Sequence, residues 1–368
     1  MRHGKLTFRL HKLQRGCRYK PHRAKGKAFL NATEVPKYVT PLVIPPVMKK
    51  AAGGKYEIAV VQFKQQILPG GIWNNERFQS LSQGKKYHYP ATTVWSYGPA
   101  SDPRPDSSSL GGGVGIAPAP NSQFNYPSYT VENFVNEETR VDWINRLVRD
   151  PWKCDWKRWR HTACPVHKWW QYQACKFLPH ITTVDQSLQD CMPRNNPELL
   201  EPYRGPVPIV VHVHGARVHS ASDGYPEAWY LPAASNIPKG YATHGHLVNK
   251  LGEKTNLHRG VASYHYPNEQ PSTTLWFHDH TLGMTRNNVY AGPAGFWILR
   301  ERGGGEGGGE TGLLGGILPH PAPAAGESLA ETNLESRSKY REIPIVIQDK
   351  SFYRDGSLFY PKKRAFFE

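Results

Sequence analysis

Several short stretches of the chain mix hydrophobic and polar positions with a period near two, which predicts β-strands. Residues 56–67 combine β-branched and aromatic side chains with partial alternation, and residues 92–98 form a shorter run that ends at a glycine. Residues 129–132 and 139–145 have the same character, and a run of β-branched residues begins at Ile209. The pattern predicts half-buried strands, because successive strand side chains point to opposite faces.

Composition narrows the fold class further. The chain has 368 residues, enough to bury a sizeable core, with 34 Gly, 32 Pro and only 4 Met. Such a composition favours a turn-rich β architecture over a helix bundle. We therefore predict an all-β sandwich with long loops. One of these loops is expected between residues 99 and 127, which are rich in Pro, Ser and Gly.

Two His-x-His pairs provide the candidate chemistry. His212 and His214 lie on the β-branched run, and His278 and His280 flank Asp279 on a second strand-like stretch. Residues two apart on a strand share a face, so four imidazoles converge if the two strands are neighbours. A single buried histidine is more often a hydrogen-bonded core residue, but two such pairs favour a metal site. Imidazole suits Cu, Zn, Fe or Ni better than Ca or Mg, and the spacing alone does not choose among them.

Long motifs around these pairs resemble a known family. The matching segments are His-Val-His-Gly at 212–215, Ser-Asp-Gly-Tyr-Pro-Glu-Ala-Trp-Tyr at 222–230, and Leu-Trp-Phe-His-Asp-His-Thr-Leu-Gly-Met-Thr-Arg-Asn-Asn-Val-Tyr-Ala-Gly at 275–292. They resemble the first domain of multicopper oxidases, in the branch that contains bilirubin oxidase and the bacterial spore-coat laccase. The likeness extends to residues 38–46, 60–69, 92–98, 143–148, 177–185 and 342–361. It implies a cupredoxin-like Greek-key β-sandwich.

The resemblance also implies roles for particular residues. By the family pattern, His212 binds a type 2 copper, while His214, His278 and His280 bind a type 3 pair. Asp223 matches an acidic residue that helps protons reach the oxygen-reducing cluster, and a positioned carboxylate can relay protons. The alternative is that Asp223 and the following glycine simply form a turn.

Other aromatic and histidine residues near the motifs are not expected to take part. Trp229 and Trp276 are interpreted as packing residues. The histidines between the motifs match no family ligand, although one pair has the same spacing: His219, His244, His246, His258 and His265.

The chain divides by composition into four segments. Residues 1–30 are predicted to be a basic disordered tail, and residues 31–301 the first cupredoxin domain, with an atypical Trp-, Cys- and Lys-rich insertion at 151–176. Residues 302–338 read as a Gly/Pro-rich linker, and residues 339–368 as the truncated start of a second cupredoxin domain. In that last segment we expect strand character at residues 343–349 and a turn at Asp355-Gly356.

The formal charge of +16 belongs mainly to two of these segments. Residues 1–28 hold ten Lys and Arg with no acidic residue, and residues 151–176 hold six against Asp155. The fold itself is nearly neutral, which argues against a specific nucleic-acid partner. A polyanion-binding surface on the tail and insertion is one alternative, and a zinc module in the insertion another, although its Cys and His spacing supports zinc poorly. We find no secretory signal and no apolar run long enough to span a membrane, so the compartment stays open.

The expected function follows from the resemblance. Relatives couple one-electron oxidation of a phenolic, bilirubin-like or metal-ion substrate to the reduction of dioxygen to water. The sequence contains no His-Cys-His stretch for a type 1 copper and supplies four of the eight cluster histidines, so we expect a copper-binding fragment that is inactive alone. The alternatives are a non-catalytic copper-binding cupredoxin, or half of a trinuclear site that a partner chain completes.

Overall fold

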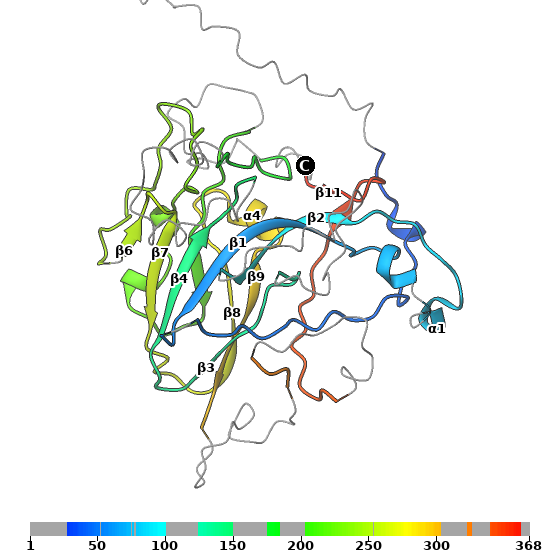
Figure 1. The fold of residues 1–368 in the computed structure, drawn as a ribbon, viewed down its shortest axis with the longest axis horizontal. Helices are drawn as coiled ribbons and strands as arrows, with labels where there is room; N and C mark the ends of the chain where they lie inside the picture. The colour runs from blue at the N-terminus through cyan, green and yellow to red at the C-terminus, as the bar shows by residue number, and fades with distance from the viewer. Residues whose placement is uncertain are drawn as a thin grey trace, which may run out of the picture.

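A computed structural model describes residues 28–51, 53–74, 76, 79–100, 124–149, 175–184, 203–252, 254–302, 322–325 and 339–361. These residues form strands with a few short helical turns (Figure 1). The strands are β1 (Tyr56–Gln65), β2 (Thr92–Pro99), β3 (Val131–Phe134), β4 (Thr139–Asn145), β5 (Val211–His214), β6 (Lys254–Asn256), β7 (Val261–Tyr266), β8 (Thr273–Asp279), β9 (Ala294–Arg300), β10 (Ser351–Phe352) and β11 (Leu358–Phe359). The α-helices are α1 (Gln79–Ser82) and α4 (Thr285–Ala291), and the 3-10 helices are η1 (Ala32–Glu34), η2 (Gly71–Asn74), η5 (Ser220–Ser222) and η6 (Pro226–Ala228).

Two sheets make up the body of the molecule. The first has five strands in the order β2-β1-β4-β7-β6, and the second has four in the order β3-β9-β8-β5. Each sheet contains one parallel pair, β1 with β4 and β3 with β9, while the other pairs are antiparallel. The chain therefore crosses between the sheets, which confirms the predicted all-β sandwich.

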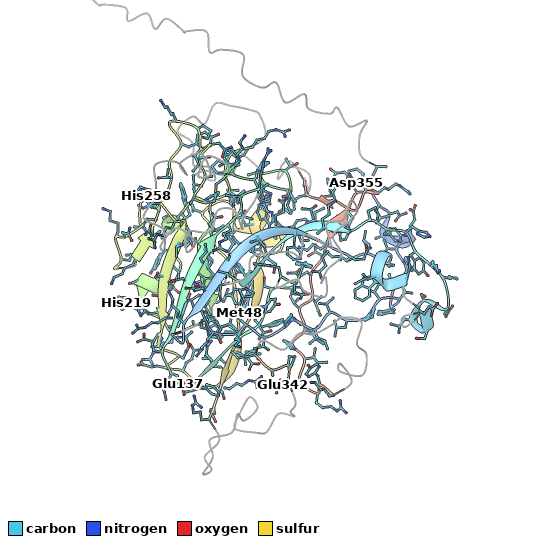
Figure 2. The ribbon with its side chains drawn as sticks, in the orientation of Figure 1. Met48, Glu137, His219, His258, Glu342 and Asp355 are labelled. Atoms are coloured by element: carbon cyan, nitrogen blue, oxygen red, sulfur yellow. The ribbon has the colours of Figure 1, made fainter. Side chains whose placement is uncertain are left out.

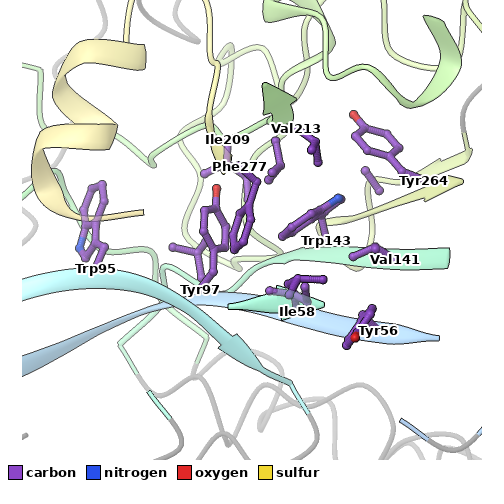
Figure 3. Packing of buried hydrophobic residues seen from close by; sticks show 14 of the residues in the cluster. Tyr56, Ile58, Trp95, Tyr97, Val141, Trp143, Ile209, Val213, Tyr264 and Phe277 are labelled. Carbon is purple, nitrogen blue, oxygen red and sulfur yellow. The ribbon is translucent and has the colours of Figure 1, made fainter. Parts of the chain in front are cut away.

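Aromatic side chains from both sheets fill the space between them (Figure 3). Tyr97 and Trp143 come from the five-stranded sheet and Phe277 from the four-stranded sheet, and all three are fully buried. Ring centroids lie 5.5 Å apart for Tyr97 and Trp143 and 5.3 Å apart for Trp143 and Phe277, within the range of favourable aromatic pairs. Because Phe277 belongs to β8, this packing holds β8 rigidly against the opposite sheet.

The residues beyond 339 pack back on the sandwich. Glu342 pairs with Arg300 of β9 at 2.7 Å, and the hydroxyl of Tyr290 on α4 accepts a hydrogen bond of 2.8 Å from the backbone N–H of Ser351. The Asp355-Gly356 turn is confirmed: Gly356 has φ of +77°, and β10 pairs with β11 on either side of it. The predicted strand at 343–349 is not formed, since no described strand pairs with these residues and a strand needs a partner for its backbone groups.

Several predictions fall outside the described residues. These are the basic tail up to residue 27, most of the loop at 101–123, the insertion at 151–174 and most of the linker at 303–338. Cys175, the one cysteine in the described part of the chain, is disulfide-bonded and so is not available as a zinc ligand. Among the described residues, no helix has both the length and the apolar character needed to cross a membrane.

Candidate metal centre

The two His-x-His pairs lie on neighbouring antiparallel strands. β5 pairs with β8 in a register that sets His212 directly opposite His278. The ring centroid of His212 lies 5.5 Å from that of His214, 5.8 Å from that of His278 and 5.0 Å from that of His280. The structure thus places the two pairs on neighbouring strands, with the ring of His212 near each of the other three rings.

Strand periodicity explains why the imidazoles share one side of the sheet. Val211 and Val213 are completely buried in the core, so the alternate residues of β5 point away from it. On β8 the ring of Phe277 is buried in the core in the same way, so the next residue, His278, points to the other face of the sheet. A slip of one residue would reverse both strands, so the core residues determine the site.

Hydrogen bonds decide which ring nitrogens remain available. The Nδ1 atom of His212 donates to the backbone oxygen of Asp223 at 2.5 Å, and Nδ1 of His278 donates to the backbone oxygen of Asp279 at 2.7 Å. The Nε2 atoms of both rings are therefore left as acceptors. His214 directs Nδ1 toward Nε2 of His278 at 3.4 Å. Two nitrogens bound to one tetrahedral metal at ordinary bond lengths would be about 3.3 Å apart.

Burial keeps the inner imidazoles in the form that binds metal. It lowers the pKa of His278 to about 4, with smaller contributions from the neighbouring histidines, and it also lowers the pKa of His280. Both rings are neutral at pH 7, as a ligand must be. Nδ1 of His280 is buried and has no hydrogen-bond partner within the described part of the chain.

The four rings do not form a closed cluster by themselves. No group of three or more His, Cys, Asp or Glu side chains converges as a metal site in the described residues. Within the described residues, one pair of ring nitrogens faces each other: Nδ1 of His214 and Nε2 of His278. This arrangement suits ions that take their remaining ligands from elsewhere.

Trp276 covers one side of the site. Its ring stacks on His278 with centroids 4.2 Å apart and planes 28° apart, and on His214 with 5.3 Å and 17°. The indole remains 41% exposed, so it lies between the imidazoles and solvent. The prediction of a packing role fits this position, but Trp276 packs against the site rather than in the core.

A tight loop brings Asp223 to His212. A Cβ atom added to Gly224, which has φ of +75°, would lie 2.0 Å from the backbone oxygen of Val211, so only glycine allows the loop to approach β5 this closely. The carboxylate of Asp223 then lies 3.2 Å from Nδ1 of His212, with its side chain 34% exposed. Asp223 also ends the helix η5, so the predicted turn role and the position beside His212 are both present.

Three buried polar residues beside the site were not predicted. Asp279 accepts a hydrogen bond of 2.9 Å from Nδ2 of Asn288, whose Oδ1 atom contacts Nε2 of His180 at 3.2 Å. Burial raises the pKa of Asp279 to about 7 and lowers that of His180 to about 4. The aspartate between two histidines was the sequence feature that could have indicated these residues. A carboxyl group buried within a strand needs several hydrogen-bond donors around it.

The remaining histidines lie away from this centre. His244 and His246 are exposed, and Nδ1 of His265 faces Glu138 at 3.3 Å. Figure 2 shows His219 and His258 at the outer edge of the molecule, beside β6 and β7. None of them joins the four imidazoles of β5 and β8.

Comparison with known proteins gives consistent relatives. No protein-family model matches the chain. A laccase of Bacillus stratosphericus is 28% identical over 237 residues, which are 64% of this chain and 30% of that protein. A laccase of Haloferax volcanii is 26% identical over 334 residues, 89% of this chain and 37% of that protein. Among solved structures, a multi-copper oxidase from Pediococcus acidilactici aligns with a TM-score of 0.35 and 14% identity, covering 77% of this chain and 33% of that one.

These findings narrow the class of protein that the chain resembles. The two sheets, with their histidine-bearing strand pair, form an all-β sandwich. The chain is similar to multicopper oxidases, with laccases among its curated relatives. It spans about a third of the length of the curated relatives that it matches.

Proposed function

We propose that this chain is the part of a laccase-like multicopper oxidase that supplies one half of an oxygen-reducing copper site. Residues 31–301 serve as its first cupredoxin domain. The observation that carries the proposal is the register that sets His212 opposite His278, because it gives four imidazoles one common face.

The chemistry of the donor set fits copper. The inner imidazoles are neutral and buried, and at least one nitrogen of His280 has no hydrogen-bond partner among the described residues. Neutral imidazole is a good ligand for copper, and the two Nδ1 hydrogen bonds to backbone oxygens orient His212 and His278 as metal-binding histidines are usually oriented. When bound, copper supplies one-electron redox chemistry at this site.

The family pattern assigns each side chain a place. His212 is proposed as the type 2 ligand, and His214, His278 and His280 as type 3 ligands. The short separation of His214 and His278 supports a shared ion for that pair. Asp223 is proposed as a proton relay, because its half-exposed carboxylate touches both solvent and the ring of His212.

The proposed reaction is that of the whole oxidase. One-electron oxidation of a phenolic, bilirubin-like or metal-ion donor is coupled to reduction of dioxygen to water. Because no group of three or more metal-binding side chains forms among the described residues, the other ligands would come from a further domain or a partner chain. We propose residues 339–361 as the beginning of a second cupredoxin domain.

Copper titration of matched variants tests the site. The double substitution of His212 and His278 by Ala is expected to reduce Cu(II) binding, measured by calorimetry and electron paramagnetic resonance, by at least a hundredfold. The matched control replaces His244 and His246, which have the same spacing on an exposed loop, and should retain wild-type binding.

Two results would contradict parts of the proposal. Equal loss of copper in both double variants would mean non-specific binding by histidines, and the site would be rejected. Copper bound at β5 and β8 without oxygen consumption, in the presence of a phenolic donor and of the remaining oxidase domains, would instead favour a non-catalytic copper-binding cupredoxin.

A further inference from the structure

Asp279 is the last residue of β8 and lies between two of the proposed copper ligands, but its side chain points away from them. The carboxylate is completely buried. Oδ1 accepts hydrogen bonds from the backbone N–H of Thr281 at 3.1 Å and from Nδ2 of Asn288 at 2.9 Å. Oδ2 accepts from the backbone N–H of Val210 at 3.2 Å and from the hydroxyl of Thr281 at 3.0 Å. Four donors on one carboxylate constitute a fully satisfied buried site.

The bond to Val210 extends the ladder between β5 and β8 beyond its last backbone pair. That pair joins Val211 to Asp279, and the N–H of His280 then donates to the backbone oxygen of Val210 at 2.8 Å. The chain turns away at this point, so the buried N–H of Val210 has no strand carbonyl opposite it. The carboxylate of Asp279 replaces that carbonyl, and an unpaired buried N–H would otherwise destabilise the strand.

A second set of bonds ties the same carboxylate to the segment that leads into β5. The Nδ2 atom of Asn288 donates both to Asp279 and to the backbone oxygen of Pro208, at 3.0 Å for the latter. His180 completes the arrangement: its Nδ1 accepts from the N–H of Thr182 at 3.0 Å, so its Nε2–H donates to Asn288. The hydrogen bonds of this series therefore all run in one direction: His180 donates to Asn288, and Asn288 donates to Asp279.

We propose that Asp279 is the positioning residue of the copper site, because its carboxylate locks the start of β5 to the end of β8 and so fixes the two histidine pairs relative to each other. The residue does not bind metal, since all four of its hydrogen bonds lie on the other face of β8. The copper readout of this inference rests on the proposed function, while the backbone readout does not.

Asp279→Asn provides the test, because it preserves size but turns one acceptor into a donor. In either orientation, the new amide nitrogen at position 279 would face two groups that are themselves donors. In one orientation these are the Val210 N–H and the Thr281 hydroxyl, and in the other the Thr281 N–H and Nδ2 of Asn288. In metal-free protein, we expect amide hydrogen exchange at Val210 to be at least tenfold faster. Cu(II) affinity should fall by at least tenfold, with an altered paramagnetic resonance spectrum.

Asp142→Asn is the matched control. Asp142 lies in β4 of the other sheet and accepts from Lys55 Nζ at 2.5 Å and from the Ser263 hydroxyl at 2.7 Å. This variant loses a partly buried carboxylate as well, and should leave exchange at Val210 and copper affinity within twofold of wild type. If Asp279→Asn does not fold, Thr281→Val removes one donor from Oδ2, and Thr281→Ser should restore the wild-type spectrum.

The outcomes separate the two claims. Unchanged exchange at Val210 together with an unchanged copper spectrum in folded Asp279→Asn overturns the positioning role. Absence of copper binding in the wild-type chain overturns the proposed function instead, and the exchange rates alone then decide the role of Asp279. An equal loss of copper in the Asp142→Asn control would assign the effect to general destabilisation and also overturn the inference.

Discussion

The pair His212 and His214 and the pair His244 and His246 have the same spacing in the sequence but lie in different surroundings. The first pair is on a strand whose alternate residues are buried, opposite a second strand that carries its own pair. The second pair is exposed, and the residue between its members, Gly245, packs against the backbone of Glu227. Only the first pair meets other imidazoles.

This difference shows that His-x-His spacing brings imidazoles together only where a neighbouring strand carries a second pair opposite the first. At β5 the backbone is held by the core valines and by the close loop at Gly224, while Asp223 lies against His212 and Trp276 stacks on His214. The backbone of the second pair is also held, since His244 is bridged to Tyr230 and the N–H of Gly245 donates to the backbone oxygen of Trp229. Its two side chains are exposed, so their rings would have to be ordered by the metal itself.

The largest effect should come from disturbing the close loop. A Cβ at Gly224 would collide with the backbone of Val211, so Gly224→Ala is expected to lower the free energy of unfolding by about 3 kcal/mol or more. Gly240→Ala, on the loop before His244, has a similar φ of +87° and open space around it, and should cost about 1 kcal/mol. Urea unfolding of both variants measures the contrast, and equal losses would contradict it.

A smaller effect is expected from acid. His180 has a pKa of about 4 in the folded protein because it is buried, against about 6.5 in the unfolded chain. The unfolded chain binds the proton more readily than the folded protein does. The contribution of His180 to the free energy of unfolding is therefore fully present above pH 6.5 and is lost as the pH falls toward 4, by up to about 1.4 kcal/mol per pH unit. Unfolding of metal-free protein across this range should show a shallower slope in His180→Asn, while His244→Asn keeps the wild-type slope. Identical slopes in both would refute the assignment.

The smallest effect concerns the stacked indole. Trp276→Ala removes the ring that packs on His214 and His278, so we expect Cu(II) affinity to fall about fivefold, the equivalent of about 1 kcal/mol. Trp276→Phe retains a stacking ring and should recover most of the affinity. Calorimetric titration measures both, and a wild-type affinity in the Ala variant would show that stacking does not order the imidazoles.

The sequence predicted those features that depend on local pattern. The strand at residues 139–145 coincides with β4, and the period-two placement of the histidines anticipated their common face. The turn at Asp355-Gly356 followed from residue types with known backbone preferences. Long family motifs added the ligand roles, which stay predictions until copper binding is measured.

Features that depend on contacts between distant segments could not be predicted. Asp279, Asn288 and His180 acquire their roles from hydrogen bonds that join residues far apart in the chain, which no spacing rule reveals. Residues 343–349 show the converse case. Their β-branched composition indicated a strand, but a strand requires a hydrogen-bonded neighbour, and no described strand pairs with them.

The pairing of β5 with β8 also sets the order of events as the chain is made. Val210 and Asp279 are 69 residues apart, and Glu132 and Arg300, which join β3 to β9, are 168 residues apart. During synthesis β5 therefore emerges long before the strand that completes it, and its row of valines stays unpaired meanwhile. Such distant pairing is slow and exposed to aggregation. The four imidazoles can lie side by side only after synthesis has passed His280, so the proposed metal site forms no earlier than that point.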